Sequence, residues 1–173
     1  MLFRLTICFL FCCSTLFAQS GSLTVKELIT LYDSDIATVS ATMTRKGFKE
    51  SFSGDRFGDV EFYQWYHGRT SHNADAFLQR YVIPASETYN WQNDCIEYIM
   101  YSSDEFLTQK RYCESIGMEL LKSGPKARTF DDHYIMDAGI VSLYQGKNYW
   151  IHFNAVTEGN KNTYKILIRK RPE

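Results

Sequence analysis

The same order of elements occurs twice along this chain of 173 residues, with a shift of 70 positions. In each copy a helical pattern ends at a glycine, Gly47 or Gly117, which suits the left-handed conformation that follows many helices. Strand-like runs follow, and the same shift pairs further landmarks: Ser53-Gly54 with Ser123-Gly124, Met43 with Cys113, Ile96 with Ile166, and Tyr98 with Ile168. These matches indicate an internal repeat, which constrains the fold more than any other feature. The alternative, that any two helix-plus-sheet halves share this order, stays open.

Helix signals open both copies. Thr24 and Glu27 have the spacing of a capping box, in which each side chain satisfies a backbone N–H group of the first helical turn. The helices that end at the two glycines are expected to be capped by Asp33 or Ser34 in the first copy, and by Ser103 or Asp104 in the second. The expected strands are 48–53, 60–67, 76–83 and 95–101, followed by 118–122, 134–144, 149–156 and 164–169.

One helix and about four antiparallel strands cannot bury a sheet alone. We therefore expect an α+β fold: a tandem repeat of a helix plus about four antiparallel strands, forming one large antiparallel sheet with the helices on one face. The two repeats span about 24–101 and 102–171. The other face of the sheet is left for water or a partner.

The first 18 residues have the features of a signal peptide. Arg4 supplies a positive charge, an apolar run covers 5–17, and small Ala18 precedes the polar Gln19. Cleavage there leaves a single domain, 19–173, with no transmembrane segment, in a protein that is periplasmic or secreted. The open alternatives are lipidation at Cys13 and an uncleaved anchor.

Two resemblances follow from these residues. The element order from Thr24 to Arg169 resembles the tandem architecture of the β-lactamase-inhibitor-protein-like and TATA-binding-protein-like folds. The Ala18-Gln19 cleavage site and the Lys46-Gly47-Phe48 helix exit look like those of small exported proteins of the Bacteroidota. The first resemblance implies a continuous sheet, and the second implies export; neither implies an activity.

The cysteines that remain after signal removal are Cys95 and Cys113. Two cysteines in an exported protein suggest a disulfide. The shift of 70 instead places Cys113 on the helix side of the sheet and Cys95 on the opposite side, outside the reach of a disulfide. We therefore predict no disulfide.

Few sequence features favour an enzyme, a metalloprotein or a nucleic-acid-binding protein. The net charge of −1 is too small for non-specific nucleic-acid binding. No nucleophile elbow or glycine-rich phosphate loop occurs, so no catalytic residue and no cofactor are predicted. The histidines and acidic groups lack metal-ligand spacing. The groups without such spacing are His67, His72, Asp131-Asp132-His133, Asp55 and Asp59. Glu61, Glu97 and Glu119 could pair in space as the two carboxylates of a glycosidase, but the sequence alone does not place them together.

Strand alternation assigns the faces of the sheet. Ile96, Tyr98, Ile166 and Ile168 are expected to meet the helices. The run 60–67 is ambiguous, because Phe62 and Tyr66 compete with Tyr63 and Trp65 for the core. The outward face is expected to carry Glu97, Ile99, Tyr101, Trp150, His152, Leu167 and Arg169.

Aromatic and arginine side chains on a wet sheet face are typical of binding surfaces. The predicted ligand-binding residues are Tyr101, Trp150, His152, Arg169 and Glu97. The sequence favours an exported non-enzymatic binding module that holds a protein or envelope ligand, or a second copy of itself as a homodimer. The alternatives are a hydrolase acting on cell-envelope polymers and a purely structural accessory protein.

Overall fold

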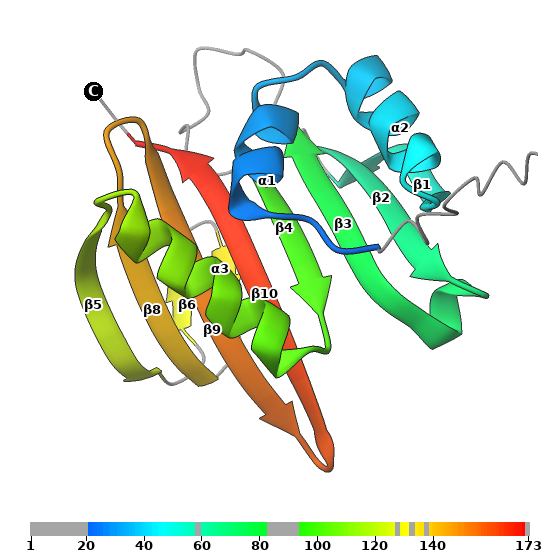
Figure 1. Ribbon diagram of the computed structural model, residues 1–173. Coiled ribbons are helices and arrows are strands. Elements are labelled where there is room, and N and C mark those ends of the chain that lie inside the picture. The colour runs from blue at the N-terminus through cyan, green and yellow to red at the C-terminus, as the bar shows by residue number, and fades with distance from the viewer. Residues whose placement is uncertain are drawn as a thin grey trace, which may run out of the picture.

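The computed structural model describes residues 21–57, 60–82, 94–126, 129–131, 134–136 and 139–171. One antiparallel sheet of eight strands, in the order β1-β2-β3-β4-β10-β9-β8-β5, dominates the fold (Figure 1). Its strands are β1 (Lys49–Phe57), β2 (Val60–Gly68), β3 (Ala74–Val82), β4 (Cys95–Met100), β5 (Glu119–Lys126), β8 (Gly139–Gln145), β9 (Tyr149–Glu158) and β10 (Lys161–Lys170). The expected α+β class with one large antiparallel sheet is confirmed.

A second, two-stranded ladder corrects one predicted strand. The run 134–144 was expected to be continuous, but the structure has β7 (Tyr134–Met136) paired with β6 (Thr129–Asp131), and a separate β8. Residues 137–138, between β7 and β8, lie outside the described residues. In Figure 1 this ladder is drawn behind the sheet, on the side away from the helices.

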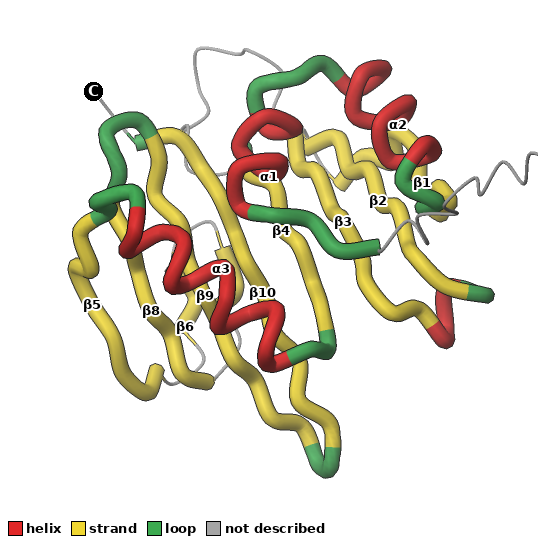
Figure 2. Tube along the Cα trace, in the orientation of Figure 1, coloured by secondary structure: helices red, strands yellow, loops and turns green. Residues whose placement is uncertain are grey.

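Three α-helices lie on one side of the sheet, as Figure 2 shows. They are α1 (Val25–Tyr32), α2 (Ile36–Arg45) and α3 (Ser103–Ser115). A short 3₁₀ turn, η1 (Ser71–Asn73), closes the hairpin between β2 and β3. The helices of the described residues therefore cover one face of the sheet.

The helix caps confirm one prediction and correct two. The capping box is present: the Glu27 N–H donates to Oγ1 of Thr24 at 3.2 Å, and the Thr24 N–H donates to Oε2 of Glu27 at 2.8 Å. The cap of α2 is Asp35, not Asp33 or Ser34. The cap of α3 is Ser102, not Ser103 or Asp104. Short polar residues cap helices almost equally well, so the pattern narrows the start of a helix only to within a few positions.

The main core lies between the helices and the sheet. It joins apolar side chains of all three helices, such as Leu28, Val39 and Phe106, to those of the central strands, such as Ile96 and Ile166. Aromatic rings interlock within it; the Phe106 ring meets the Phe153 ring edge-on, with centroids 5.4 Å apart. The ambiguity of β2 is resolved, because Trp65 is fully buried in this core while Phe62 is buried on the opposite face.

The centre of the sheet is the antiparallel pair β4–β10. Ile96 pairs with Ile168, Glu97 with Leu167, and Tyr98 with Ile166. Strands far apart in the sequence therefore meet in the middle of the fold, while β1 and β5 form its two edges.

In the described part of the chain, no helix combines the length and the apolar character needed to cross a membrane.

Candidate functional site

The face of the sheet that points away from the helices is called the outer face here. Cross-strand pairing brings one row of its residues together: Gln79 on β3, Glu97 on β4, Leu167 on β10 and His152 on β9. The sequence placed three of these on this face, and the strand registers agree.

The centre of the outer face is not open to water, which corrects the expectation for two predicted ligand residues. Glu97 is 6% exposed and His152 is 7% exposed. Alternation along a strand tells on which side a residue lies, but not how deeply it is covered. In the middle of a wide sheet, large neighbours on both adjacent strands flank each side chain. Glu97 and His152 are therefore poorly placed for direct contact with a ligand.

Trp150 and Arg169 form a half-buried pair toward one end of the outer face. The Arg169 guanidinium lies over the Trp150 ring, 5.2 Å from its centroid, which is a cation–π arrangement. The indole N–H of Trp150 donates to Oε1 of Gln145 at 3.2 Å. These contacts fix the two side chains as a structural unit of the sheet.

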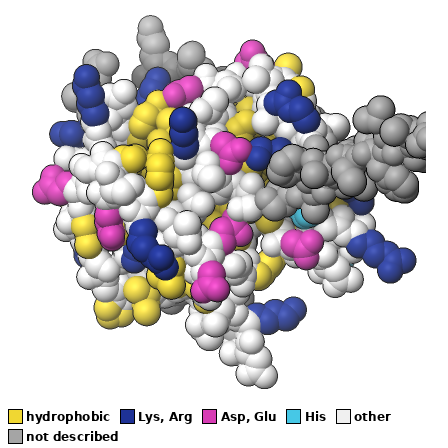
Figure 3. Space-filling model, viewed as in Figure 1, with side chains coloured by type: hydrophobic (Ala, Val, Ile, Leu, Met, Phe, Trp, Pro, Cys, Tyr) yellow, Lys and Arg dark blue, Asp and Glu magenta, His cyan; other side chains and the backbone are white. Residues whose placement is uncertain are grey.

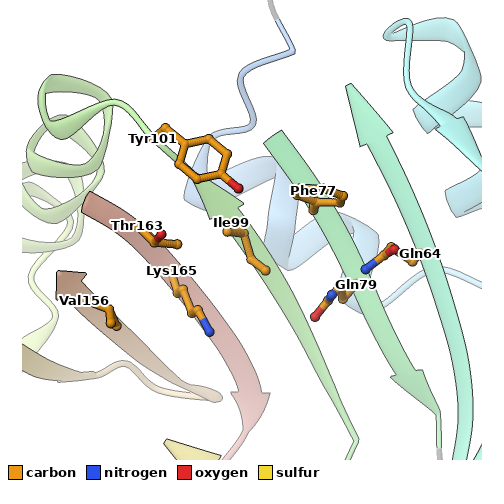
Figure 4. A pocket seen from close by; sticks show the side chains of 8 residues that line it. All are labelled: Gln64, Phe77, Gln79, Ile99, Tyr101, Val156, Thr163 and Lys165. Carbon is orange, nitrogen blue, oxygen red and sulfur yellow. The ribbon is translucent and has the colours of Figure 1, made fainter. Parts of the chain in front are cut away.

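Tyr101 is the predicted ligand residue that is most exposed, at 46%. It follows β4 directly and stands on the rim of a hollow of about 250 Å³ in the outer face. The residues that line this hollow come from β2, β3, β4, β9 and β10, and Tyr101 borders them; Figure 4 shows Gln64, Phe77, Gln79, Ile99, Tyr101, Val156, Thr163 and Lys165.

The hollow combines an apolar floor with a polar rim. Phe77 and Ile99 face each other across β3 and β4, and Lys165 is the next partner of Ile99 on β10. No carboxylate is among the lining residues of the hollow, and Lys165 is the one charged group among them. This chemistry can hold a small ligand but offers no acid–base pair.

Two glutamine side chains of the hollow are held by hydroxyl groups. Ser51 Oγ donates to Oε1 of Gln64 at 2.9 Å, and the Tyr81 hydroxyl donates to Oε1 of Gln79 at 3.0 Å. Burial, with the nearby Glu97 carboxylate, raises the pKa of Tyr81, so its hydroxyl remains a donor at neutral pH. The two glutamines pair directly across β2 and β3, so their amides are neighbours.

A second concavity of about 480 Å³ lies at the start of β3 and the end of β4, near the start of α3. Its polar lining includes Ser22, His67, Asp75 and Glu105. Nδ1 of His67 is 3.6 Å from Oδ2 of Asp75. A histidine, two carboxylates and a hydroxyl in one concavity are groups that a hydrolase can use, so this concavity is a candidate site for such chemistry.

The hydrogen bonds in this second concavity serve the fold. Ser22 Oγ donates to Oε1 of Glu105 at 2.7 Å, and the Tyr98 hydroxyl lies 3.1 Å from the same oxygen. The Ser22 hydroxyl is thus directed at a carboxylate and not at His67. A Cβ atom on Gly21 would lie 2.2 Å from the His67 ring, so the chain packs tightly against this imidazole. A serine nucleophile is activated when its hydroxyl donates to a general base, whereas the Ser22 hydroxyl donates to Glu105 instead of His67.

The other chemical candidates from the sequence are distributed as follows. Within the described residues there is no group of three or more His, Cys, Asp or Glu side chains that could hold a metal ion. Asp132 and His133 lie outside the described residues. Both Cys95 and Cys113 are free thiols; Cys113 belongs to the core beneath the helices, while Cys95 is buried instead of exposed as expected.

Some large apolar side chains of the described residues are exposed, and Figure 3 shows apolar (yellow) atoms interspersed among charged and other atoms on the side of the molecule seen in Figure 1. The exposed side chains include Leu107 of α3, Ile116 at its end, Leu120 and Leu121 of β5, and Ile140 of β8. Leu121 lies at a register shift between β5 and β8, so strand alternation does not assign its side chain to a face.

The chain was compared with known proteins in three ways. No protein-family model matches it, and neither a curated protein nor a solved structure is significantly similar to it.

Proposed function

We propose that this chain is exported and acts as a non-enzymatic binding module, which holds a protein or envelope ligand against the outer face of its sheet. The observation that carries this proposal is the hollow bordered by Tyr101, with an apolar floor at Phe77 and Ile99 and a rim of amide, hydroxyl and ammonium groups. Ligand sites typically combine a mainly apolar lining with a few placed polar groups. The helices of the described residues lie on the other side of the sheet, so this hollow faces away from the main core.

The proposal shifts the ligand site relative to the five residues predicted from the sequence. Tyr101 stays in direct contact with the ligand. Glu97 and His152 are almost fully covered and are not among the lining residues of the hollow, so the proposed site does not include them. Trp150 and Arg169 form their cation–π pair outside the hollow, on the same face of the sheet.

The test is capture of the ligand from the native envelope by the tagged protein and by an Ile99→Lys variant. Ile99 lies at the floor of the hollow, so a lysine there fills it and introduces a charge. The matched control is Leu107→Lys, the same chemical change at an exposed position of α3 on the opposite side of the sheet. Both variants are first checked for native melting temperature.

We expect the wild-type protein and Leu107→Lys to capture the same partner, and Ile99→Lys to lose it. Equal capture by all three proteins would show that the hollow is not the binding site.

A hydrolase acting on envelope polymers is the second candidate, favoured by His67, Asp75 and Glu105 in the second concavity. It requires a different arrangement of Ser22, whose hydroxyl is directed at Glu105. Turnover of purified envelope polymer by the wild-type protein that is lost in His67→Ala, but kept in Ile99→Lys, would favour this candidate over the binding module.

We also infer that the two halves of the chain descend from one repeated unit, as in the tandem folds that its element order resembles. Matching irregularities support this. The Phe48 N–H donates to the Met43 carbonyl at 3.0 Å, and 70 positions later the Met118 N–H donates to the Cys113 carbonyl at 3.0 Å. The edge strands also shift register at matching places, passing over Ser51 in β1 and Leu121 in β5.

A further inference from the structure

We propose that the hollow in the outer face takes an N-acetylated sugar, with the acetamido group against its floor. This inference rests on the proposed binding function and names the ligand class for the same site. It follows from the types of donor at the rim, the apolar floor and the size of the space.

Gln64 and Gln79 supply the amide donors of the hollow. Gln64 and Gln79 are cross-strand partners, and the side-chain carbonyl oxygen of each already accepts a hydrogen bond, from Ser51 and from Tyr81. This fixes both amides and leaves their nitrogens to donate. Two adjacent N–H₂ groups suit a ligand with a carbonyl oxygen and a neighbouring hydroxyl, because each amide nitrogen offers two donors.

The floor suits a methyl group. Phe77, Ile99 and Val156 supply its apolar surface, and in Figure 4 the Tyr101 ring stands above Ile99 with its hydroxyl turned toward the hollow. An aromatic ring can pack against the C–H face of a sugar while its hydroxyl makes a polar contact. An acetamido group carries both a carbonyl acceptor and a methyl group, so it matches the floor and the rim together.

Size and charge exclude other occupants. A space of about 250 Å³ lies below the usual range for drug-sized ligands, so it accepts about one ring and not a helix. A peptide strand cannot pair with the backbone there, because β3, β4, β10 and β9 each have partners on both sides. Among the described residues that line the hollow there is no carboxylate to attract a free amine.

The experiment uses ligand-observed NMR on the purified protein with three probes: N-acetylglucosamine, glucose and glucosamine. We expect saturation transfer to N-acetylglucosamine, strongest at its methyl protons, and at least about tenfold weaker binding of the other two. Equal binding of glucose, or strongest binding of glucosamine, would overturn the N-acetyl assignment.

The Gln79→Glu variant tests the amide donors, because it keeps the shape of the side chain and replaces the N–H₂ group with an acceptor. We expect binding of N-acetylglucosamine to weaken at least about tenfold, which corresponds to about 1.4 kcal/mol. Asn148→Asp, the same change at an exposed turn, serves as the control and should bind as the wild-type protein does. Unchanged binding in Gln79→Glu would refute the role of the amides.

The outcomes separate this inference from the function on which it rests. If Ile99→Lys loses its envelope partner but no probe binds the wild-type protein, the site is correct and the sugar assignment is wrong. If Ile99→Lys keeps its partner and the probes do not bind, the binding function at this hollow fails as well.

Discussion

The backbone N–H of Val25 donates to Oε1 of Gln109 at 2.8 Å, which joins the first residue of α1 to the middle of α3. Gln109 is 5% exposed, so this bond is formed in the interior. The first N–H groups of a helix have no partner within the helix. A side chain 84 positions away in the sequence satisfies this one, so the two helices depend on each other.

Replacing Gln109 with leucine should destabilise the protein by about 1–3 kcal/mol, because the buried N–H of Val25 loses its acceptor. Urea denaturation followed by circular dichroism measures the change. Thr108→Ala, at the neighbouring exposed position, should cost less than about 1 kcal/mol. Equal effects of the two changes would contradict the role of this bond.

The thiols of Cys95 and Cys113 should resist alkylation in the folded protein. Burial, with the nearby Glu97 carboxylate, raises the pKa of Cys95, and burial with Glu114 raises the pKa of Cys113 to about 12. Only the thiolate reacts, and both side chains are covered. Treatment with iodoacetamide at pH 8, then peptide mass spectrometry, should find both unlabelled without urea and labelled with it. A peptide joining the two cysteines would disprove the predicted absence of a disulfide.

The stabilising effect of Glu27 should depend on pH. Burial tends to raise the pKa of its carboxyl, but the hydrogen bonds from Lys46 and Thr24 outweigh this and hold the pKa below its usual 4.5. A carboxyl with a lowered pKa stabilises the fold above the unfolded-state pKa, and the contribution is lost as the pH falls through the folded-state value.

Thermal unfolding of the wild-type protein and of Glu27→Gln should therefore differ at pH 6 and converge near pH 3. Lys46→Met should show the same convergence, because its ammonium lies 2.7 Å from Oε1 of Glu27. A difference in melting temperature that stays constant across this range would count against the assignment.

Gly139→Ala should weaken the contact between β8 and β9. A Cβ atom at this position would lie 2.3 Å from the backbone oxygen of Ala155, too close for any side chain. We expect a loss of about 1–3 kcal/mol in the free energy of unfolding, the usual cost of overpacking. Ile140→Ala, the next residue and one that is 60% exposed, is the control and should change it by less than about 1 kcal/mol.

Periodicity predicted most of the architecture. The capping box, the glycines that end two helices and the alternation of β4, β9 and β10 depend on local chemistry, which a single sequence shows directly. The predicted N-cap of α2, Asp33 or Ser34, was wrong. Asp35 lies in the same polar turn, and the backbone conformation decides which of these residues caps the helix.

The candidate site was predicted less well, for a geometrical reason. Gln64, Phe77 and Gln79 are neighbours only through the registers of β2, β3 and β4, which the chain order does not specify. Strand alternation predicts on which face of the sheet Glu97 and His152 lie, but their burial depends on the side chains that surround them in the fold.

The position of β10 gives the fold a particular order of completion. This strand comes after the nine others along the chain but lies in the middle of the sheet, hydrogen-bonded to β4 on one side and β9 on the other. Without this strand, β4 and β9 would each lack the hydrogen-bonded neighbour that joins them in the folded sheet. When the chain emerges from its N-terminus, the two halves of the sheet thus stay incomplete until residues 161–170 join them. Truncation within this segment divides the molecule at its centre, whereas loss of β1 removes only an edge.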